Sequence, residues 1–319
     1  MVFRLNYSGF IVLVWTLCFL PSAQAQQQSL FSHYFWNEQH YNPAYAGSKD
    51  MLHVQALYRM QWVGMKGAPN TLNATVHSPL KNDKLALGIN FYNDRIGAMQ
   101  SNGITAQYAY RLKLADKYTL SMGLQGGVEF RNVNWAELHT DDLLPDPVGD
   151  ALYAKSILPI VGAGVYFYSN QFSLGFGVPQ LLPKTLFKGD QWGVEPSNNM
   201  FLSGSYQWNI SEDFRLLPTA TMRLAKGNPL QAEITASAIL YDMFQAGIGV
   251  RTDKTAIFMA QFMPNIGDGK KKMRIGYSYD LSWKALRPSN SGSHELMISF
   301  GMPVFSQGSS PVIKSPRYF

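Results

Sequence analysis

The chain has 319 residues, of which 46% are hydrophobic, 13% aromatic and 15% charged, with a net charge of +6 and a mean hydropathy of −0.12. Its single cysteine, Cys18, lies in an N-terminal apolar stretch, and no basic run is interleaved with aromatic residues. Once that stretch is removed, disulfides, thiol catalysis and cysteine-bound metals are excluded, and nothing in the composition points to nucleic acid.

Residues 1–25 have the layout of a secretory signal peptide. Arg4 precedes an apolar run from Phe10 to Leu20, and the small residues of Ala23-Gln24-Ala25 predict cleavage before Gln26. The alternative, a short membrane anchor, is disfavoured because this run is too short to span a bilayer. The sequence therefore predicts a signal peptide at residues 1–25.

Residues 26–51 precede the first regular pattern and are predicted to be an N-terminal periplasmic lead segment. Within it, Asn42–Gly47 begins with an Asn-Pro pair, which favours a turn, and ends with a glycine, which permits positive φ. Two interpretations stay open. The stretch is either a small plug or docking element at the periplasmic mouth, or a simple turn that leads into the first strand.

From about Leu52 to Val304 the chain reads as short segments that alternate apolar and polar residues, as β-strands with one apolar face do. In the first segment the apolar face carries Val54, Ala56, Tyr58, Met60 and Trp62, and the polar face carries Gln55, Arg59 and Gln61. The fourteen predicted strands are Leu52–Trp62, Thr71–Ser78, Leu85–Tyr92, Ile104–Leu114, Tyr118–Phe130, Ile157–Tyr168, Phe172–Val178, Met200–Trp208, Phe214–Leu224, Leu230–Leu240, Phe244–Arg251, Ala256–Phe262, Met273–Leu281 and His294–Val304.

The connections between these strands also alternate in length. Those after even-numbered strands are short, whereas several after odd-numbered strands are long, including Asn93–Gly103 and Arg131–Ser156; Pro264–Lys272 breaks the rule. Short periplasmic turns, long external loops and an even strand number are typical of outer-membrane barrels. We therefore predict a transmembrane antiparallel β-barrel over residues 52–305, in preference to a soluble β-sandwich.

The last residues, 306–319, are predicted to be an extended periplasmic tail, because glycine, serine and proline recur there. Its end, Lys314–Phe319, is basic and aromatic, and we favour a docking or plugging role for it over a free tail. An aromatic residue that ends the final strand is common in outer-membrane barrels, and Phe305 or Phe319 fits that pattern.

Charged residues of the barrel suggest structural roles. Arg59 and Gln61 are expected to face the lumen, either in an interior polar network or in contact with cargo or a plug. A buried arginine usually needs a carboxylate partner, and Asp94 and Glu129 are the candidates. Asp94-Arg95 is expected to be a local ion pair in an external loop.

No catalytic or metal motif is predicted. The carboxylates between residues 132 and 155 lack the spacing of an EF-hand and are expected to form a solvated acidic loop. His294 and Glu295 are adjacent strand residues on opposite faces, so Ser293-His294-Glu295 cannot form a triad by itself. We therefore expect no enzyme, no cofactor and no metal site.

Several patches together resemble the PorP/SprF family of outer-membrane proteins, which belong to the type IX secretion system of Bacteroidota. No single patch decides this, but their order and spacing are specific. The resemblance covers essentially the whole mature chain and is weakest over Val133–Asn199. The patches are Asn42–Ser48, Tyr58–Trp62, Gly67–Pro69, Leu87-Gly88, Asn93–Gly97, Tyr108–Tyr110, Leu120–Leu124, Ser293–Glu295 and Pro316–Phe319.

The resemblance implies a non-enzymatic barrel in the bacterial outer membrane that binds the C-terminal domain of secreted cargo, such as a gliding adhesin. It also implies contact with other secretion components, including periplasmic motor and ring proteins. A passive pore or small-molecule transporter and a structural link to a periplasmic complex are the alternatives. Candidate partner-binding residues are Asn42, Pro43, Tyr45, Arg59, Gln61, Trp62, Arg317, Tyr318 and Phe319.

Overall fold

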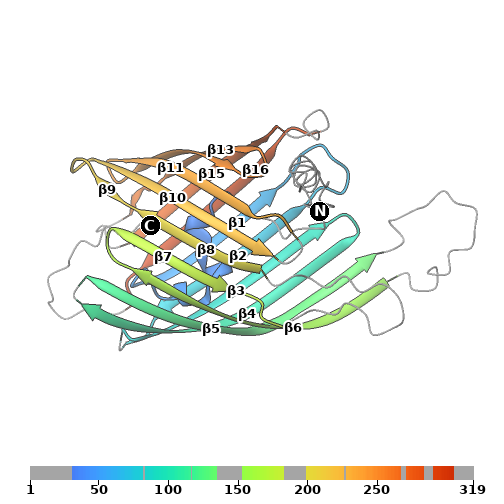
Figure 1. Ribbon diagram of the computed structural model, residues 1–319, viewed down its shortest axis with the longest axis horizontal. Helices are drawn as coiled ribbons and strands as arrows, with labels where there is room; N and C mark the ends of the chain where they lie inside the picture. The colour runs from blue at the N-terminus through green and yellow to red at the C-terminus, as the bar shows by residue number, and fades with distance from the viewer. Residues whose placement is uncertain are drawn as a thin grey trace, which may run out of the picture.

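The computed structural model describes residues 31–304, except 82, 116, 135–152, 183–198, 226–227, 267–270 and 284–289. Sixteen strands form one closed antiparallel sheet, and two of them, β9 and β14, have only two residues each. The other fourteen make a barrel that closes where β1 pairs with β16 (Figure 1). The predicted fold class, a transmembrane antiparallel β-barrel of fourteen strands, is confirmed. The predicted signal peptide and C-terminal tail lie outside the described residues.

The strand bounds agree closely with the predicted segments. The strands are β1 (Leu52–Met60), β2 (Asn70–Pro79), β3 (Leu85–Ile96), β4 (Met99–Ala115), β5 (Tyr118–Asn134), β6 (Tyr153–Tyr168), β7 (Phe172–Val178), β8 (Asn199–Tyr206), β9 (Trp208–Asn209), β10 (Phe214–Ala225), β11 (Gln231–Leu240), β12 (Phe244–Arg251), β13 (Thr255–Phe262), β14 (Asn265–Ile266), β15 (Lys271–Ser282) and β16 (Ser293–Met302). Three short helical turns precede them: η1 (Tyr34–Asn37), α2 (Glu38–Tyr41) and η2 (Pro43–Tyr45).

One predicted connection is wrong. The stretch Asn93–Gly103 is not a long loop, because β3 and β4 stay paired up to Ile96 and Met99. The chain reverses there over two residues, and Gly97 takes a positive φ of 54°, as tight hairpin turns require. The polar residues that suggested a loop continue the strand ladder instead.

The two ends of the barrel differ, and we name them by their connections. At the turn end β1 begins and β16 ends, and the short turns 80–84, 169–171, 210–213 and 241–243 lie there. The opposite end, the loop end, carries the connections 61–69, 135–152, 179–198 and 283–292. Strands β4, β5 and β6 are the longest and project at the loop end (Figure 1).

Side chains alternate between the two faces of the wall as predicted. On β16 the exposed residues Leu296, Ile298 and Phe300 face outward, whereas Glu295 and Ser299 are buried in the lumen. Aromatic residues gather on the outer face near the turn end: Tyr118, Phe167, Phe172, Tyr206, Trp208, Phe244 and Phe262. An apolar belt with aromatic residues at its edge is what a lipid-facing barrel surface needs.

The lumen is filled by the N-terminal segment Phe31–Ser48, which we call the plug. Every residue of the plug is buried, and its three helical turns lie inside the strands (blue in Figure 1). Of the two interpretations of Asn42–Gly47, the structure agrees with a plug, and the buried segment extends further, over Phe31–Ser48. Within the described residues, no helix is both long enough and apolar enough to cross a membrane.

Candidate functional site in the barrel lumen

The start of the plug is held by a carboxylate of the wall. One oxygen of Glu295 accepts a hydrogen bond from the backbone N–H of His33 (2.7 Å) and lies 2.7 Å from its Nδ1. The other oxygen accepts from the backbone N–H of Ser32 (2.9 Å) and from Arg59 (3.1 Å). Two consecutive backbone N–H groups form a small anion-binding concavity. We call this contact the latch.

The latch belongs to a larger ionic network on the lumenal wall. Arg59 bridges Glu295 and Asp280, with 2.7 Å to the Asp280 carboxylate. Asp280 also lies 3.3 Å from Arg251, which pairs with Glu233 at 2.6 Å. The hydroxyl of Ser32 donates to Asp280 (2.5 Å) and accepts from both arginines. Such groups are stable out of water only when paired this completely.

The predicted partners of Arg59 are wrong. Glu129 instead pairs with Arg131 and accepts a hydrogen bond from Tyr92, and Asp94 accepts one from Thr71 (2.6 Å). The physical reason is the closure of the barrel, which places β16 and β15, not β3 or β5, beside the start of the wall at β1. Asp94 and Arg95 lie in β3 and not in a loop. Because adjacent strand residues point to opposite faces, they do not form the expected local ion pair.

The middle of the plug is held by neutral groups and not by ion pairs. Asn37 accepts a hydrogen bond from Gln55 (3.1 Å), and Gln39 bonds to the Val76 carbonyl and to Gln107. Glu38 is fully buried, with Ser203 and Tyr166 as the hydrogen-bonding neighbours of its carboxylate.

The end of the plug sits on a patch of glycines in the wall, which we call the seat. A Cβ atom at Gly123 would lie 2.2 Å from the backbone nitrogen of Ala44, and one at Gly177 would lie 2.4 Å from the Tyr41 carbonyl oxygen. Asn42 accepts from the Ala44 N–H (3.0 Å) and donates to the Val165 carbonyl (3.0 Å). Only glycine leaves room for the plug backbone to pass this closely.

The plug joins β1 through a tether at the turn end. Gly47 has a φ of +78°, and a Cβ there would lie 2.3 Å from the Cβ of Ala86, so this position needs glycine. Its backbone N–H donates to His77 (3.1 Å). Asp50 then pairs with Arg111 of the wall. The tether is thus fixed beside the first residue of the barrel.

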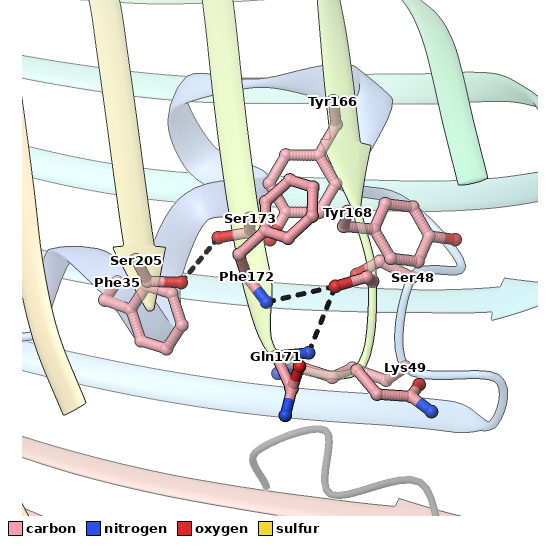
Figure 2. A pocket seen from close by; sticks show the side chains of 11 residues that line it. Phe35, Ser48, Lys49, Tyr166, Tyr168, Gln171, Phe172, Ser173 and Ser205 are labelled. Atoms are coloured by element: carbon pink, nitrogen blue, oxygen red, sulfur yellow. Dashed lines mark hydrogen bonds between the residues drawn. The ribbon is translucent and has the colours of Figure 1, made fainter. Parts of the chain in front are cut away.

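A shallow pocket opens beside the tether, between the plug and strands β6, β7 and β8 (Figure 2). Phe35, Ser48 and Lys49 line it from the plug side, and Tyr166, Tyr168, Phe172, Ser173 and Ser205 line it from the wall. The two wall serines bond to each other at 2.7 Å. The lining combines aromatic rings with neutral polar side chains, and Lys49 is its charged residue.

The sequence-predicted site residues fall into three groups. Asn42, Pro43, Tyr45 and Arg59 are buried and contact the wall or the plug. Gln61 and Trp62 follow β1 in the 61–69 connection at the loop end. Trp62 has a φ of 50°, and its backbone N–H donates a hydrogen bond to the Ser293 hydroxyl. Arg317, Tyr318 and Phe319 lie outside the described residues.

Several residues of the network were not predicted: Ser32, His33, Glu233, Arg251 and Asp280. The signal that could have identified them is a charged side chain on the polar face of a strand, since the lumen is the only buried place where it can go. Glu295 points into the lumen and His294 away from it, as expected. In the described part of the chain, no group of three or more His, Cys, Asp or Glu residues could hold a metal ion, and the predicted acidic loop falls largely outside that part.

Comparison with known families identifies the class of the protein. The family model "Type IX secretion system membrane protein PorP/SprF" matches residues 23–300. This chain belongs to the PorP/SprF family. The predicted resemblance is therefore confirmed over most of the sequence. No curated protein matches the chain significantly.

Solved structures with similar folds are outer-membrane barrels with low sequence identity. The toluene transporter TodX of Pseudomonas putida is 9% identical, with 88% of this chain and 96% of that chain covered and a TM-score of 0.46. A FadL homologue of Pseudomonas aeruginosa is 11% identical, with 82% and 91% covered and a TM-score of 0.46. Similarity at this level carries no information on what a PorP/SprF chain binds.

Proposed function

We propose that this PorP/SprF protein is a non-enzymatic, plugged barrel of the outer membrane that binds the C-terminal domain of secreted cargo and assists its secretion or surface attachment. One observation carries the choice of binding over conduction: all residues of Phe31–Ser48 are buried in the lumen. A barrel whose interior is occupied by its own chain offers its outer ends, and not a channel, to other proteins.

The loop end supplies a surface for such a partner. The outward face of the long strands is apolar up to Phe91, Ile104 and Phe130 and becomes polar beyond them, where Asn93 donates to Asn102 across the β3–β4 pair. The wall therefore continues past the lipid-facing belt on one side of the barrel. We place the cargo contact on this extension and on the neighbouring Gln61 and Trp62.

The turn end carries the second set of proposed contacts. The tether, the pocket beside Lys49 and the start of the predicted tail at Val304 all lie there. Because this end holds both termini of the barrel, it faces the periplasm in the orientation typical of bacterial barrels. We assign contacts with periplasmic components of the secretion system to it, together with Arg317, Tyr318 and Phe319.

The proposal is tested by crosslinking the tagged protein in outer membranes of secreting cells and identifying bound proteins by mass spectrometry. A large secreted protein joined through its C-terminal domain is the expected product, and crosslinks should map to the loop end. Recovery of periplasmic components alone would favour the structural link instead. Purified protein in planar bilayers should show no steady current, whereas a steady open-channel current would support the pore.

A further inference from the structure

The plug runs through the lumen from one end of the barrel to the other. Its first residues contact Arg59 and Glu295, which lie near the loop-end limits of β1 and β16. Its middle bonds to Gln55 and Gln107, half-way along β1 and β4. Its last residues reach Ser121 and His77, near the turn end of β5 and β2.

This threading restricts how the plug can leave. The tether at Gly47–Asp50 fixes the plug to β1 at the turn end, whereas the first described residues of the plug lie toward the loop end. A segment tied at one mouth can be withdrawn through that mouth without breaking the chain. Leaving through the loop end would require the tether and the start of β1 to unfold. The turn end is therefore the exit.

The start of the plug depends on one charged group of the wall. Glu295 makes three contacts with the plug, to the backbone N–H groups of Ser32 and His33 and to the His33 ring, and a fourth with Arg59 of the wall. The middle is bonded through several neutral groups instead, for example Gln39 to the wall amide Gln107 and to two backbone carbonyls. A change of the single charge at Glu295 should therefore loosen the start of the plug more than any one change loosens its middle.

The ion pairs of the wall do not depend on the plug. If Ser32 and His33 withdraw, Arg59 keeps both Asp280 and Glu295, and Arg251 keeps Glu233 and Asp280. No arginine of the network is left without a carboxylate. The barrel wall can therefore remain folded and polar while its lumen opens.

We propose that Phe31–Ser48 is a releasable gate that opens by withdrawal toward the turn end, and that Glu295 is the latch that keeps it closed. The inference rests on the plug alone and not on the identity of any cargo. The cargo-binding proposal is tested separately by crosslinking. In bilayers the two proposals also differ, since a steady current in the wild type would support the pore, whereas the gate predicts discrete openings that become more frequent when the latch is weakened.

Opening is measured as current events in planar bilayers that contain the full-length protein. Glu295→Gln keeps the size of the side chain but removes the charge that binds the plug amides, and we expect about tenfold more openings than in wild type. Ser32→Ala removes only the plug hydroxyl and leaves every wall ion pair intact, so it should raise the frequency in the same direction. The control is Glu129→Gln, a buried wall carboxylate that bonds to Tyr92 and Arg131 and should stay at the wild-type frequency.

A thiol crosslink ties the current to the plug. Asn37 and Gln55 bond side chain to side chain, so cysteines at both positions are within reach of a short bis-thiol crosslinker that a reductant cleaves, and the mature chain is predicted to hold no other cysteine. In Asn37→Cys/Gln55→Cys/Glu295→Gln, the crosslinker should abolish the openings and a reductant should restore them. Folding is checked by heat-dependent migration on gels, and crosslinking by mass spectrometry. Folded Glu295→Gln and Ser32→Ala variants without extra openings, or openings that persist in the crosslinked protein, would overturn the gate.

The direction is tested in vesicles that carry Asn37→Cys in the Glu295→Gln background. A bulky maleimide should react with Cys at 37 when it is added from the turn end, and not from the loop end. Two exposed positions report which end is reached: Lys117→Cys at the turn end and Lys66→Cys at the loop end. Labelling from the loop end would contradict withdrawal through the turn end.

Discussion

The two ends of the plug are held by different physical means. At the loop end the latch is ionic: Glu295 and Asp280 bind backbone N–H groups and a hydroxyl of the plug while arginines of the wall compensate their charge. At the turn end the seat is steric: glycines of β5 and β7 let the plug backbone approach the wall, and Asn42 adds one hydrogen bond, to the Val165 carbonyl of the wall.

The two kinds of contact differ in whether they can break and re-form. An ionic contact between groups that keep other partners can break and re-form without leaving a bare charge. A close steric fit has no such second state, because packed interiors do not deform continuously. The latch is therefore the end that can switch, and the seat is the end that positions the segment. Variants at each end should accordingly have different consequences.

The largest effect is expected from Arg59→Leu. The change leaves Glu295 and Asp280 in the lumen with one positive neighbour fewer, and removing one partner from a buried pair costs about 3–5 kcal/mol. Urea unfolding of the barrel in lipid vesicles measures the loss. Arg95→Leu is the matched control, since Arg95 is exposed and surface pairs contribute at most about 1 kcal/mol. Equal losses in the two variants would show that the network does not hold the structure.

The seat should respond to added volume. Gly123→Leu places a side chain where the plug backbone now lies, and overpacking of this kind costs about 1–3 kcal/mol. Because the seat has no alternative arrangement, we expect the plug to leave and Asn37→Cys to become reactive to maleimide. Gly126→Leu is the control on the same strand, because a Cβ there meets nothing within 4 Å. A plug that stays protected in Gly123→Leu would mean that the seat adapts.

Much of the wall could be predicted from the sequence, because alternation with period two follows directly from strand geometry. The hairpin at Gly97 was not predicted, because its polar residues suggest a loop. The sequence does not show that the strands continue beyond the apolar belt. The plug shows no period; a small plug is one of two interpretations of Asn42–Gly47, and only the tertiary structure shows that the buried segment begins at Phe31 and fills the lumen. The partners of Arg59 are 221 and 236 residues away, across the barrel closure, and no local pattern reports such a distance.

The smallest effect is expected at Asn42, where two roles can be separated. Asn42→Ala removes the bond to the Ala44 N–H and the bond to the Val165 carbonyl, at a cost of about 0.5–2 kcal/mol. Asn42→Asp keeps an acceptor for the first bond but brings a carboxylate against the carbonyl oxygen of the second.

If Asn42 serves only to cap η2, the aspartate should restore most of the stability lost in the alanine variant. If its contact with the wall matters, the aspartate should be at least as destabilising as alanine. We expect the second result, because the side chain of Asn42 lies against Gly164 and Gly177, and a carboxylate there would face the Val165 carbonyl oxygen. Urea unfolding measures the stability of each variant, and the reactivity of Asn37→Cys toward maleimide measures whether the plug stays in the lumen. Together they decide whether Asn42 acts mainly by capping η2 or by its contact with the wall.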